Sequence, residues 1–199
     1  MTITKRFFSK ALASLMLAGL CLCFVTSGVR GQCPSNIDPT SVTWSGPIND
    51  SASLSCSGSC EVVVSFCYRS ITDAPNPDIL EIYIEGITLE GSSCDNCGFS
   101  AVMNEAKQIA LNHFGGALPA CSGTYRITGK LFLSSSFYLN TNSFNKAFDP
   151  CGNGTSYCVE TCQLCYSGGV VTATGCTFST IGTPDCSGCP GGGIQVSCQ

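Results

Sequence analysis

The sequence predicts an α+β protein in which a mostly antiparallel sheet carries one amphipathic helix, at about residues 99–114, and is stabilised by disulfides. Three observations predict this fold class. Several segments have the composition and alternation of strands, a single segment has the period of a helix, and cysteine is unusually frequent. Because strands precede and follow the one helix, a helix packed on an antiparallel sheet fits better than repeated βαβ units.

The first 31 residues have the pattern of a secretory signal peptide. Basic residues come first, an apolar run from Ala11 to Val25 follows, and small residues precede a cleavage point expected after Gly31. The apolar run is shorter than the ~20 residues that a membrane-spanning helix needs, which disfavours an uncleaved anchor. We therefore expect residues 32–199 to form a single disulfide-rich domain, with an irregular Gly/Pro/Cys-rich tail at about 182–199.

Removal of the leader leaves an acidic chain. Five basic residues remain against thirteen acidic ones, which is a net charge of −8. Such a chain repels nucleic acid and anionic membranes, and no basic patch offsets the repulsion. We therefore expect no nucleic-acid partner, and no membrane partner after the signal peptide is cleaved.

Fifteen of the seventeen cysteines follow the leader. This content in an exported chain is typical of a disulfide scaffold. The sequence does not give the pairing, and because the count is odd we expect one thiol to be free, to act as a ligand or to form an intermolecular disulfide. The candidates for structural disulfides are Cys33, Cys56, Cys60, Cys67, Cys94, Cys97, Cys121, Cys151, Cys158, Cys162, Cys165, Cys176, Cys186, Cys189 and Cys198.

Six segments are predicted to be strands, the clearest of them with β-branched and aromatic residues alternating with polar ones. They are Ser41–Ser45, Glu61–Arg69, Ile79–Leu89, Thr124–Leu133 and two shorter candidates near Tyr157–Tyr166 and Val170–Phe178. The segment Ala74–Pro77 separates the second from the third as a turn.

One helix is predicted at Phe99–Phe114. Its apolar residues recur at steps of three and four, which makes one stripe for packing on the sheet. Gly115 and Gly116 end the helix, and Pro119 prevents its resumption. The residues expected to be buried are Val102, Met103, Ala106, Ile109 and Ala110, and those expected to face outward are Asn104, Lys107 and Gln108.

The cysteines also form three Cys-x2-Cys pairs, which are Cys94/Cys97, Cys162/Cys165 and Cys186/Cys189. Two such pairs would suit tetrahedral zinc in a reducing compartment, but outside the cell we expect disulfides, with no metal and no cofactor. The pair Cys94/Cys97 opens the predicted helix, where a thiolate is stabilised as in thiol–disulfide oxidoreductases. The absence of their βαβ context and the negative charge of Asp95 count against a redox role.

Hydrolytic chemistry has little support. His113 is the only histidine, and we expect it to cap or pack the end of the helix. A glycosidase needs only two carboxylates, and Glu81 and Glu85 share one face of a predicted strand. We expect these carboxylates to form ion pairs with Arg126 and Lys130 on an adjacent antiparallel strand, which is a structural role.

The segment 134–153 is rich in Ser and Asn, with aromatic residues between them. These are Phe137, Tyr138, Phe144 and Phe148. We expect an edge strand and a loop whose aromatic rings fold back onto the core. The alternative is an exposed surface of aromatic rings and amides that stacks on sugar rings, which would make the chain a ligand-binding protein.

Three segments together resemble a set of uncharacterised exported cysteine-rich proteins from environmental bacteria. They are Cys60–Arg69, the motif Cys94-Asp-Asn-Cys97 before a helix, and the Cys-x3-Cys-x2-Cys-Tyr pattern of residues 158–166. The resemblance covers most of the chain after the leader, implies no activity, and favours a bacterial cell surface or extracellular setting, with the periplasm as an alternative.

The function that the sequence favours is a non-enzymatic surface, matrix or adhesive module. Few charges, many Gly, Ser and Asn turns and no catalytic cluster favour it. The alternative is an exported enzyme, either a redox protein that uses Cys94 and Cys97 or a carboxylate-based glycosidase.

Overall fold

The computed structural model describes residues 33–35, 37, 42–54, 59–72, 78–91, 93–141, 146–151, 156–183, 189–190, 193–196 and 198. The chain divides into two compact units, 1–30 and 31–199, and every described residue belongs to the second. The predicted signal peptide lies outside the described residues, so its cleavage stays a prediction. No helix among the described residues is long and apolar enough to cross a membrane.

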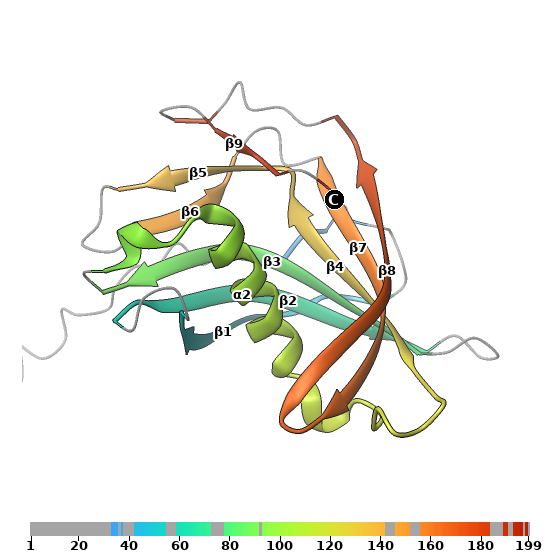
Figure 1. The fold of residues 1–199 in the computed structure, drawn as a ribbon. Coiled ribbons are helices and arrows are strands. Elements are labelled where there is room, and N and C mark those ends of the chain that lie inside the picture. The colour runs from blue at the N-terminus through green and yellow to red at the C-terminus, as the bar shows by residue number, and fades with distance from the viewer. Residues whose placement is uncertain are drawn as a thin grey trace, which may run out of the picture. The chain divides into compact units, whose positions relative to one another are not determined.

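The described part of the second unit contains nine strands, one α-helix and two short 3-10 helices (Figure 1). In chain order they are β1 (Ser45–Ser53), β2 (Glu61–Ile71), β3 (Ile79–Glu90), η1 (Cys94–Asn96), α2 (Phe99–Asn112), η2 (Gly115–Ala117), β4 (Ile127–Ser134), β5 (Ser136–Asn140), β6 (Lys146–Pro150), β7 (Tyr157–Ser167), β8 (Val170–Ile181) and β9 (Ile194–Gln195).

All nine strands belong to one sheet that branches at β3. One edge of β3 pairs with β2 along its whole length, and β2 pairs in turn with β1. On the other edge, residues 79–84 pair with β4 and residues 87–89 pair with β6. The sheet continues from β4 to β7 and β8, and from β6 to β5 and β9.

The sheet is mixed, because β3 and β4 run parallel where the sequence analysis expected an antiparallel pair. A parallel pair needs a crossover connection of a dozen or more residues. Here the segment between β3 and β4 contains α2 and is long enough to return the chain to the same end of the sheet. The strand-rich fold with one helix is thus as predicted, whereas the strand directions are not.

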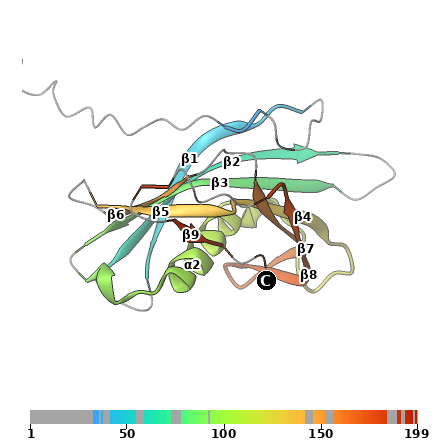
Figure 2. The same ribbon diagram turned by 90° about the horizontal axis from the view of Figure 1, so that it is seen from above.

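The helix α2 packs inside a curve of the sheet. It contacts β1, β2 and β3 on one side and β8 on the other, although β1 and β8 lie at opposite ends of the sheet (Figures 1 and 2). The five residues of the predicted apolar stripe are all buried. Asn104 is exposed as expected, but Lys107 and Gln108 are half-buried because they reach β7 and β8.

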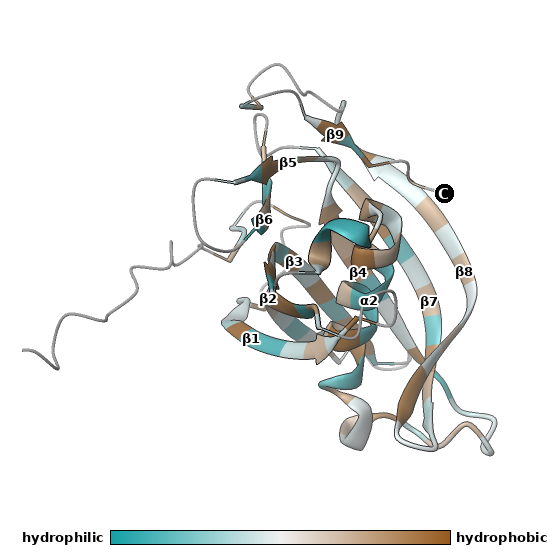
Figure 3. Cartoon of the chain, turned by 60° about the vertical axis from the view of Figure 1, so that its left-hand side comes forward, coloured by the Kyte–Doolittle hydropathy of each residue, from teal (hydrophilic) through white to brown (hydrophobic). Residues whose placement is uncertain are grey.

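Apolar side chains fill the space on both faces of the sheet, and Figure 3 shows hydrophobic and hydrophilic bands alternating along its strands. The larger cluster lies between α2 and the sheet and includes Phe66, Ile82 and Leu131. A smaller cluster on the opposite face includes Tyr83 and Phe132 and packs against the segment that precedes β1. The sheet is therefore buried on two sides, which explains why some of its polar residues are buried as well.

Two strand boundaries differ from the prediction. β1 begins at Ser45, whereas Val42–Trp44 is irregular, so the strand predicted at Ser41–Ser45 is displaced along the chain. β4 begins at Ile127, so Tyr125 and Arg126 precede the strand, and Tyr125 is 52% exposed. The strands predicted near Glu61, Ile79, Tyr157 and Val170 are all present.

Six disulfides join described cysteines and confirm that the fold is disulfide-stabilised. They are Cys33–Cys67, Cys60–Cys94, Cys121–Cys165, Cys151–Cys189, Cys158–Cys198 and Cys162–Cys176. Cys97 is also disulfide-bonded, while Cys56 and Cys186 lie outside the described residues. Each such bond typically contributes ~2–4 kcal/mol to stability.

The C-terminal tail is attached to the sheet where it is described. Cys189 and Cys198 carry two of the disulfides, and β9 pairs with β5. The tail predicted to be irregular thus contributes one short strand of two residues.

Candidate functional site

Three charged residues form one row across β2, β3 and β4. Arg69 is paired in register with Glu81, and Glu81 is paired in register with Lys130. Arg69 Nε donates to Glu81 Oε2 at 2.6 Å, and Lys130 Nζ lies 3.2 Å from Glu81 Oε1. Glu81 is 0% exposed and Arg69 4%. One buried carboxylate is therefore held between two cations.

This row only partly agrees with the predicted ion pairs. Lys130 does pair with Glu81, but through parallel strands. Arg126 pairs with neither predicted carboxylate and instead donates to the backbone carbonyls of Gly123, Tyr125 and Cys121. The prediction was wrong for Arg126 because this residue precedes β4 and is not held in the register of the strand.

Glu81 is buried because the segment before β1 covers it. The centre of the Trp44 ring lies 4.5 Å from the guanidinium of Arg69. The same ring forms edge-to-face contacts with the rings of Tyr83 and Phe132. The carbonyl of Ile37 accepts a hydrogen bond from Arg69 Nη2 at 3.3 Å. The sequence predicted that the face carrying Arg69 and Glu81 is exposed to solvent. The alternation of apolar and polar residues in β2 and β3 does not indicate that another segment packs on this face.

A cavity of about 310 Å³ lies beside Trp44 and Arg69. Its lining residues are Cys33, Pro34, Ser35, Val42, Thr43, Trp44 and Arg69. The indole Nε1 of Trp44 is buried and donates to no described protein atom. The cavity can therefore offer the aromatic ring of Trp44 and polar side chains such as Thr43 and Arg69 to a small ligand. Its cysteine offers no thiol, because Cys33 is bonded to Cys67.

Glu85, the second carboxylate considered for a glycosidase, is set apart from the row of charges. It is the extra residue of a β-bulge, because Phe66 pairs with Ile84 while Ser65 pairs with Gly86. Ser65 Oγ donates to Glu85 Oε2 at 3.2 Å. Burial raises the pKa of the Glu85 carboxyl above its ordinary value, and the hydrogen bond from Ser65 acts in the opposite direction.

Cys94 is bonded to Cys60, so it does not form a disulfide with Cys97. Cys94 is 4% exposed and lies in η1, immediately before α2. A redox Cys-x2-Cys motif requires a bond between its own two cysteines and an accessible thiol. The observed bond instead ties the start of the helix to the start of β2.

His113 lies at the C-terminal end of α2, as expected. Its Nδ1 lies 3.1 Å from Asp50 Oδ2, and its ring contacts Phe66 and Phe114 edge-on. These contacts attach the end of the helix to β1 and β2.

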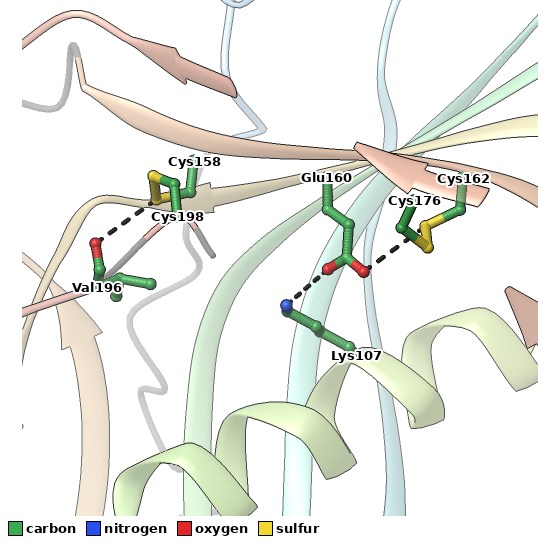
Figure 4. Close-up of polar contacts among 7 residues, drawn as sticks. All are labelled: Lys107, Cys158, Glu160, Cys162, Cys176, Val196 and Cys198. Carbon is green, nitrogen blue, oxygen red and sulfur yellow. Dashed lines mark hydrogen bonds and ion pairs between the residues drawn. A yellow bond between two sulfur atoms is a disulfide. The ribbon is translucent and has the colours of Figure 1, made fainter. Parts of the chain in front are cut away.

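Glu160 on β7 forms an ion pair with Lys107 of the helix (Figure 4). Its Oε2 accepts from Lys107 Nζ at 2.6 Å, and its Oε1 lies 3.6 Å from Cys162 Sγ. Ligand atoms of Glu160, Cys162 and Cys176 all lie within 4.8 Å of one another, which is close enough for a metal ion. However, the two sulfurs are bonded to each other and the carboxylate is neutralised by Lys107, so the cluster offers no thiolate ligand.

The described aromatic residues of the segment 134–153 fold back onto the core for the most part. Phe137 is 0% exposed and Phe148 6%, and both rings contact Phe99 at the start of α2. Tyr138 is half-buried, and Phe144 lies outside the described residues. The described residues therefore do not present the row of exposed rings that the sugar-binding alternative needs.

The described part of the chain defines a class of protein, a strand-rich domain with one helix that is stabilised by disulfides and suited to an oxidising compartment. No family model matches the chain, and no match was found among curated proteins or solved structures. The contacts within the chain itself therefore have to support any functional conclusion.

Proposed function

We propose that the chain is an exported, non-enzymatic module of a bacterial cell surface or extracellular matrix. The observation that supports this proposal is the engagement of its reactive side chains in structural contacts. Glu81 is held by two cations, Cys94 is bonded to Cys60, and Glu160 is bound to Lys107. Catalytic groups must instead reach a substrate in the correct protonation state.

The distribution of stabilising bonds agrees with a protein that persists outside the cell. Five of the six described disulfides connect both ends of the domain and the helix-bearing segment to the sheet. The sixth, Cys162–Cys176, joins the neighbouring strands β7 and β8. Disulfides keep a protein folded where no intracellular chaperone or reductant acts on it. Surface and matrix proteins depend on a fold that persists outside the cell. Their function does not need a reactive side chain.

Two of the groups considered for an exported enzyme, Glu81 and Cys94, are buried, whereas Glu85 is half-buried and is held by Ser65. Glu81 is 0% exposed and Cys94 4%. A glycosidase that used Glu81 would have to displace the segment of Trp44, and a redox protein that used Cys94 would first have to break its bond to Cys60.

Two assays of the oxidised chain 32–199 test the proposal. The first measures cosedimentation with bacterial peptidoglycan sacculi and with insoluble polysaccharides, and the second measures turnover of chromogenic glycosides and reduction of insulin. The proposal expects retention in the pellet without turnover. Turnover that disappears in Glu81→Gln or in Cys94→Ser, measured below the melting temperature of each variant, would overturn it.

A second candidate function is the binding of a small molecule in the cavity beside Trp44. The observation that favours it is that Trp44, whose buried indole N–H donates to no described protein atom, also lines about 310 Å³ of space. Buried polar groups normally have a hydrogen-bond partner, and an unsatisfied one calls for an explanation such as a bound ligand or water.

Trp44 is the only tryptophan of the chain, so all tryptophan emission comes from the lining of this cavity. Titration with the probe 1-anilinonaphthalene-8-sulfonate, an aromatic anion, should quench Trp44 emission if the cavity admits a ligand. The variant Thr43→Phe, which places a ring in the cavity lining, should abolish the quenching. Emission that the probe leaves unchanged in the parent chain would contradict this second function.

A further inference from the structure

We propose that β8 pairs edge to edge with β8 of a second copy of this chain, which gives a two-fold dimer with an antiparallel strand pair at its centre. β8 ends one arm of the sheet and pairs only with β7 among the described strands. An edge strand presents a row of N–H and C=O groups without partners, which another strand can bind. All residues of β8 except Val171 and Cys176 are exposed. Near the start of the strand, α2 already binds Val171, whose N–H donates to Asn112 Oδ1 and whose carbonyl accepts from Gln108 Nε2.

β8 lacks three of the features by which proteins usually block an edge strand, namely charge, proline and shortness, although its register contains one irregularity. Over its twelve residues it contains no charged residue and no proline. β1, the edge strand at another end of the sheet, contains Pro47 and Asp50 and has an irregular register between Ser45 and Ile48. β9 is only two residues long. Proline, charge and shortness all discourage edge pairing, so among the described edge strands β8, which is long, uncharged and free of proline, is the most open to a partner strand.

Large exposed apolar side chains are concentrated on this strand. Five large hydrophobic residues are exposed in the described part of the chain, and three of them, Val170, Phe178 and Ile181, lie on β8. In Figure 3 the strand is coloured white to brown over its length, which marks the absence of strongly hydrophilic residues. Contact with a partner would remove this apolar area from water.

A β-bulge limits pairing to the second part of the strand. Gln163 of β7 pairs with Thr174 and Thr161 pairs with Thr177, so two residues of β8, Gly175 and Cys176, lie opposite the single residue Cys162 of β7. Gly175 has a φ of 62°, in the left-handed region. Because a bulge bends the edge and disrupts its hydrogen-bond pattern, we place the contact at residues 177–181, beyond the bulge.

The exposed side chains fit a pairing centred on Ser179. In an antiparallel self-pairing about this residue, Phe178 lies opposite Thr180 of the second copy and Ile181 lies opposite its Thr177. Both exposed apolar residues of the segment are then covered by a threonine, which offers a methyl group. Ser179 lies opposite its own copy, at the two-fold axis.

The absence of charge on β8 allows two copies of this acidic chain to meet there. The net charge after the leader is −8, so two copies repel each other over most of their surface. β8 carries none of the acidic residues, so a contact there places no carboxylates side by side. A basic partner would gain little at β8, because the strand has no carboxylate with which to pair.

Sedimentation equilibrium of the oxidised chain 32–199 tests the pairing. We expect the parent chain to reach twice the mass of one chain at concentrations up to about 0.5 mM, which would detect even a weak interface. Ser179→Lys places two ammonium groups opposite each other and should weaken the dimer at least ~10-fold, because facing like charges cost several kcal/mol. Thr172→Lys is the matched control, since Thr172 is exposed on the same strand before the bulge, and it should leave the dimer intact.

A charge-reversal mixture makes the test specific to self-pairing. Ser179→Asp alone should be as monomeric as Ser179→Lys, whereas an equimolar mixture of the two variants should restore a dimer. A parent chain that stays monomeric, a Ser179→Lys variant that stays dimeric, or a mixture that stays monomeric would each overturn the proposal. The pairing does not depend on the proposed function, since a dimer that also shows substrate turnover would contradict that function and leave the pairing intact.

Discussion

The carboxylate of Glu81 and the guanidinium of Arg69 meet at 2.6 Å between directly paired residues of β3 and β2, and both side chains are buried. Burial of two charges costs several kcal/mol each in lost hydration, and their attraction offsets this cost only while both are present. Lys130 approaches the other oxygen of the same carboxylate. The stability of this face of the sheet therefore depends on one negative charge.

Replacement of that charge should be strongly destabilising. Glu81→Gln keeps the volume of the side chain but leaves Arg69 and Lys130 close together without a carboxylate between them. We expect a loss of ~3–5 kcal/mol in the free energy of unfolding, the usual effect of removing one partner from a buried ion pair. Denaturant unfolding followed by the fluorescence of Trp44, which lies on Arg69, would measure it.

Glu85→Gln is the matched control, because Glu85 lies on the same strand, is half-buried and accepts its hydrogen bond from a neutral serine. Its free energy of unfolding at neutral pH should not fall. Equal losses in Glu81→Gln and Glu85→Gln would show that the ion pair adds nothing beyond the cost of any change in β3.

Glu85 should also give the protein a specific pH dependence. Burial raises the pKa of its carboxyl in the folded state above the ordinary value of 4.5. A carboxyl with a raised folded pKa binds its proton more tightly in the folded than in the unfolded chain, so this residue's contribution to stability decreases as the pH rises from 4.5 through the folded pKa. Glu85→Gln should therefore raise the melting temperature at pH 7 more than at pH 4. An equal change at both pH values would contradict the assignment.

The sequence predicted the elements whose pattern is local. The apolar stripe from Val102 to Ala110 and the alternation in β2 and β3 depend on side-chain period alone, and the structure contains these elements as well as β7 and β8, which were predicted as shorter candidates. Helix and strand periods decide which residues face a core before any partner is known. The predicted burial of Met103 and Ile109 follows from the same rule and is confirmed.

The relationships between distant segments could not be predicted in this way. The parallel register of Glu81 and Lys130 depends on the crossover through α2, and the burial of Arg69 depends on Trp44, which lies far from it in the sequence. A charged residue in an alternating strand indicates a solvated face only when no other segment covers that face. In the sequence, the one indication that a segment covers this face is Trp44, the single tryptophan of the chain. The disulfide between Cys33 and Cys67 holds the segment before β1 on β2.

The packing of α2 can be tested at Met103, which is 4% exposed beneath the helix. Met103→Ala should lower the free energy of unfolding by ~2–5 kcal/mol, the usual cost of truncating a large buried side chain, and Met103→Asp should abolish folding, because it buries an unpaired charge. Near-ultraviolet circular dichroism and thermal melting would report both effects. The exposed neighbour Asn104 provides the control, since Asn104→Asp should melt close to the parent chain. An unchanged melting temperature in Met103→Asp would refute the packing of this face.

The last prediction concerns the bond between Cys60 and Cys94, because it separates a structural role from a redox role. These cysteines are 2% and 4% exposed. Loss of the bond should cost ~2–4 kcal/mol through the freedom that the unfolded chain regains. The double variant in which both cysteines become serine should lose no more stability than Cys94→Ser, since each variant removes the same bond.

Accessibility gives an independent measurement of the same bond. Mild reduction of the native protein followed by iodoacetamide and peptide mapping should leave Cys60 and Cys94 unlabelled and still linked to each other, because reductant and reagent cannot reach buried sulfurs without unfolding. The same treatment in denaturant should label both, which serves as the control. A redox motif would behave differently in two ways, since Cys94 would be labelled first in the native protein and the recovered oxidised peptide would link it to Cys97. Either result would make Cys94 a candidate catalytic residue again. Protection of both sulfurs would instead support a structural role for this bond, which is to hold the start of α2 against the sheet.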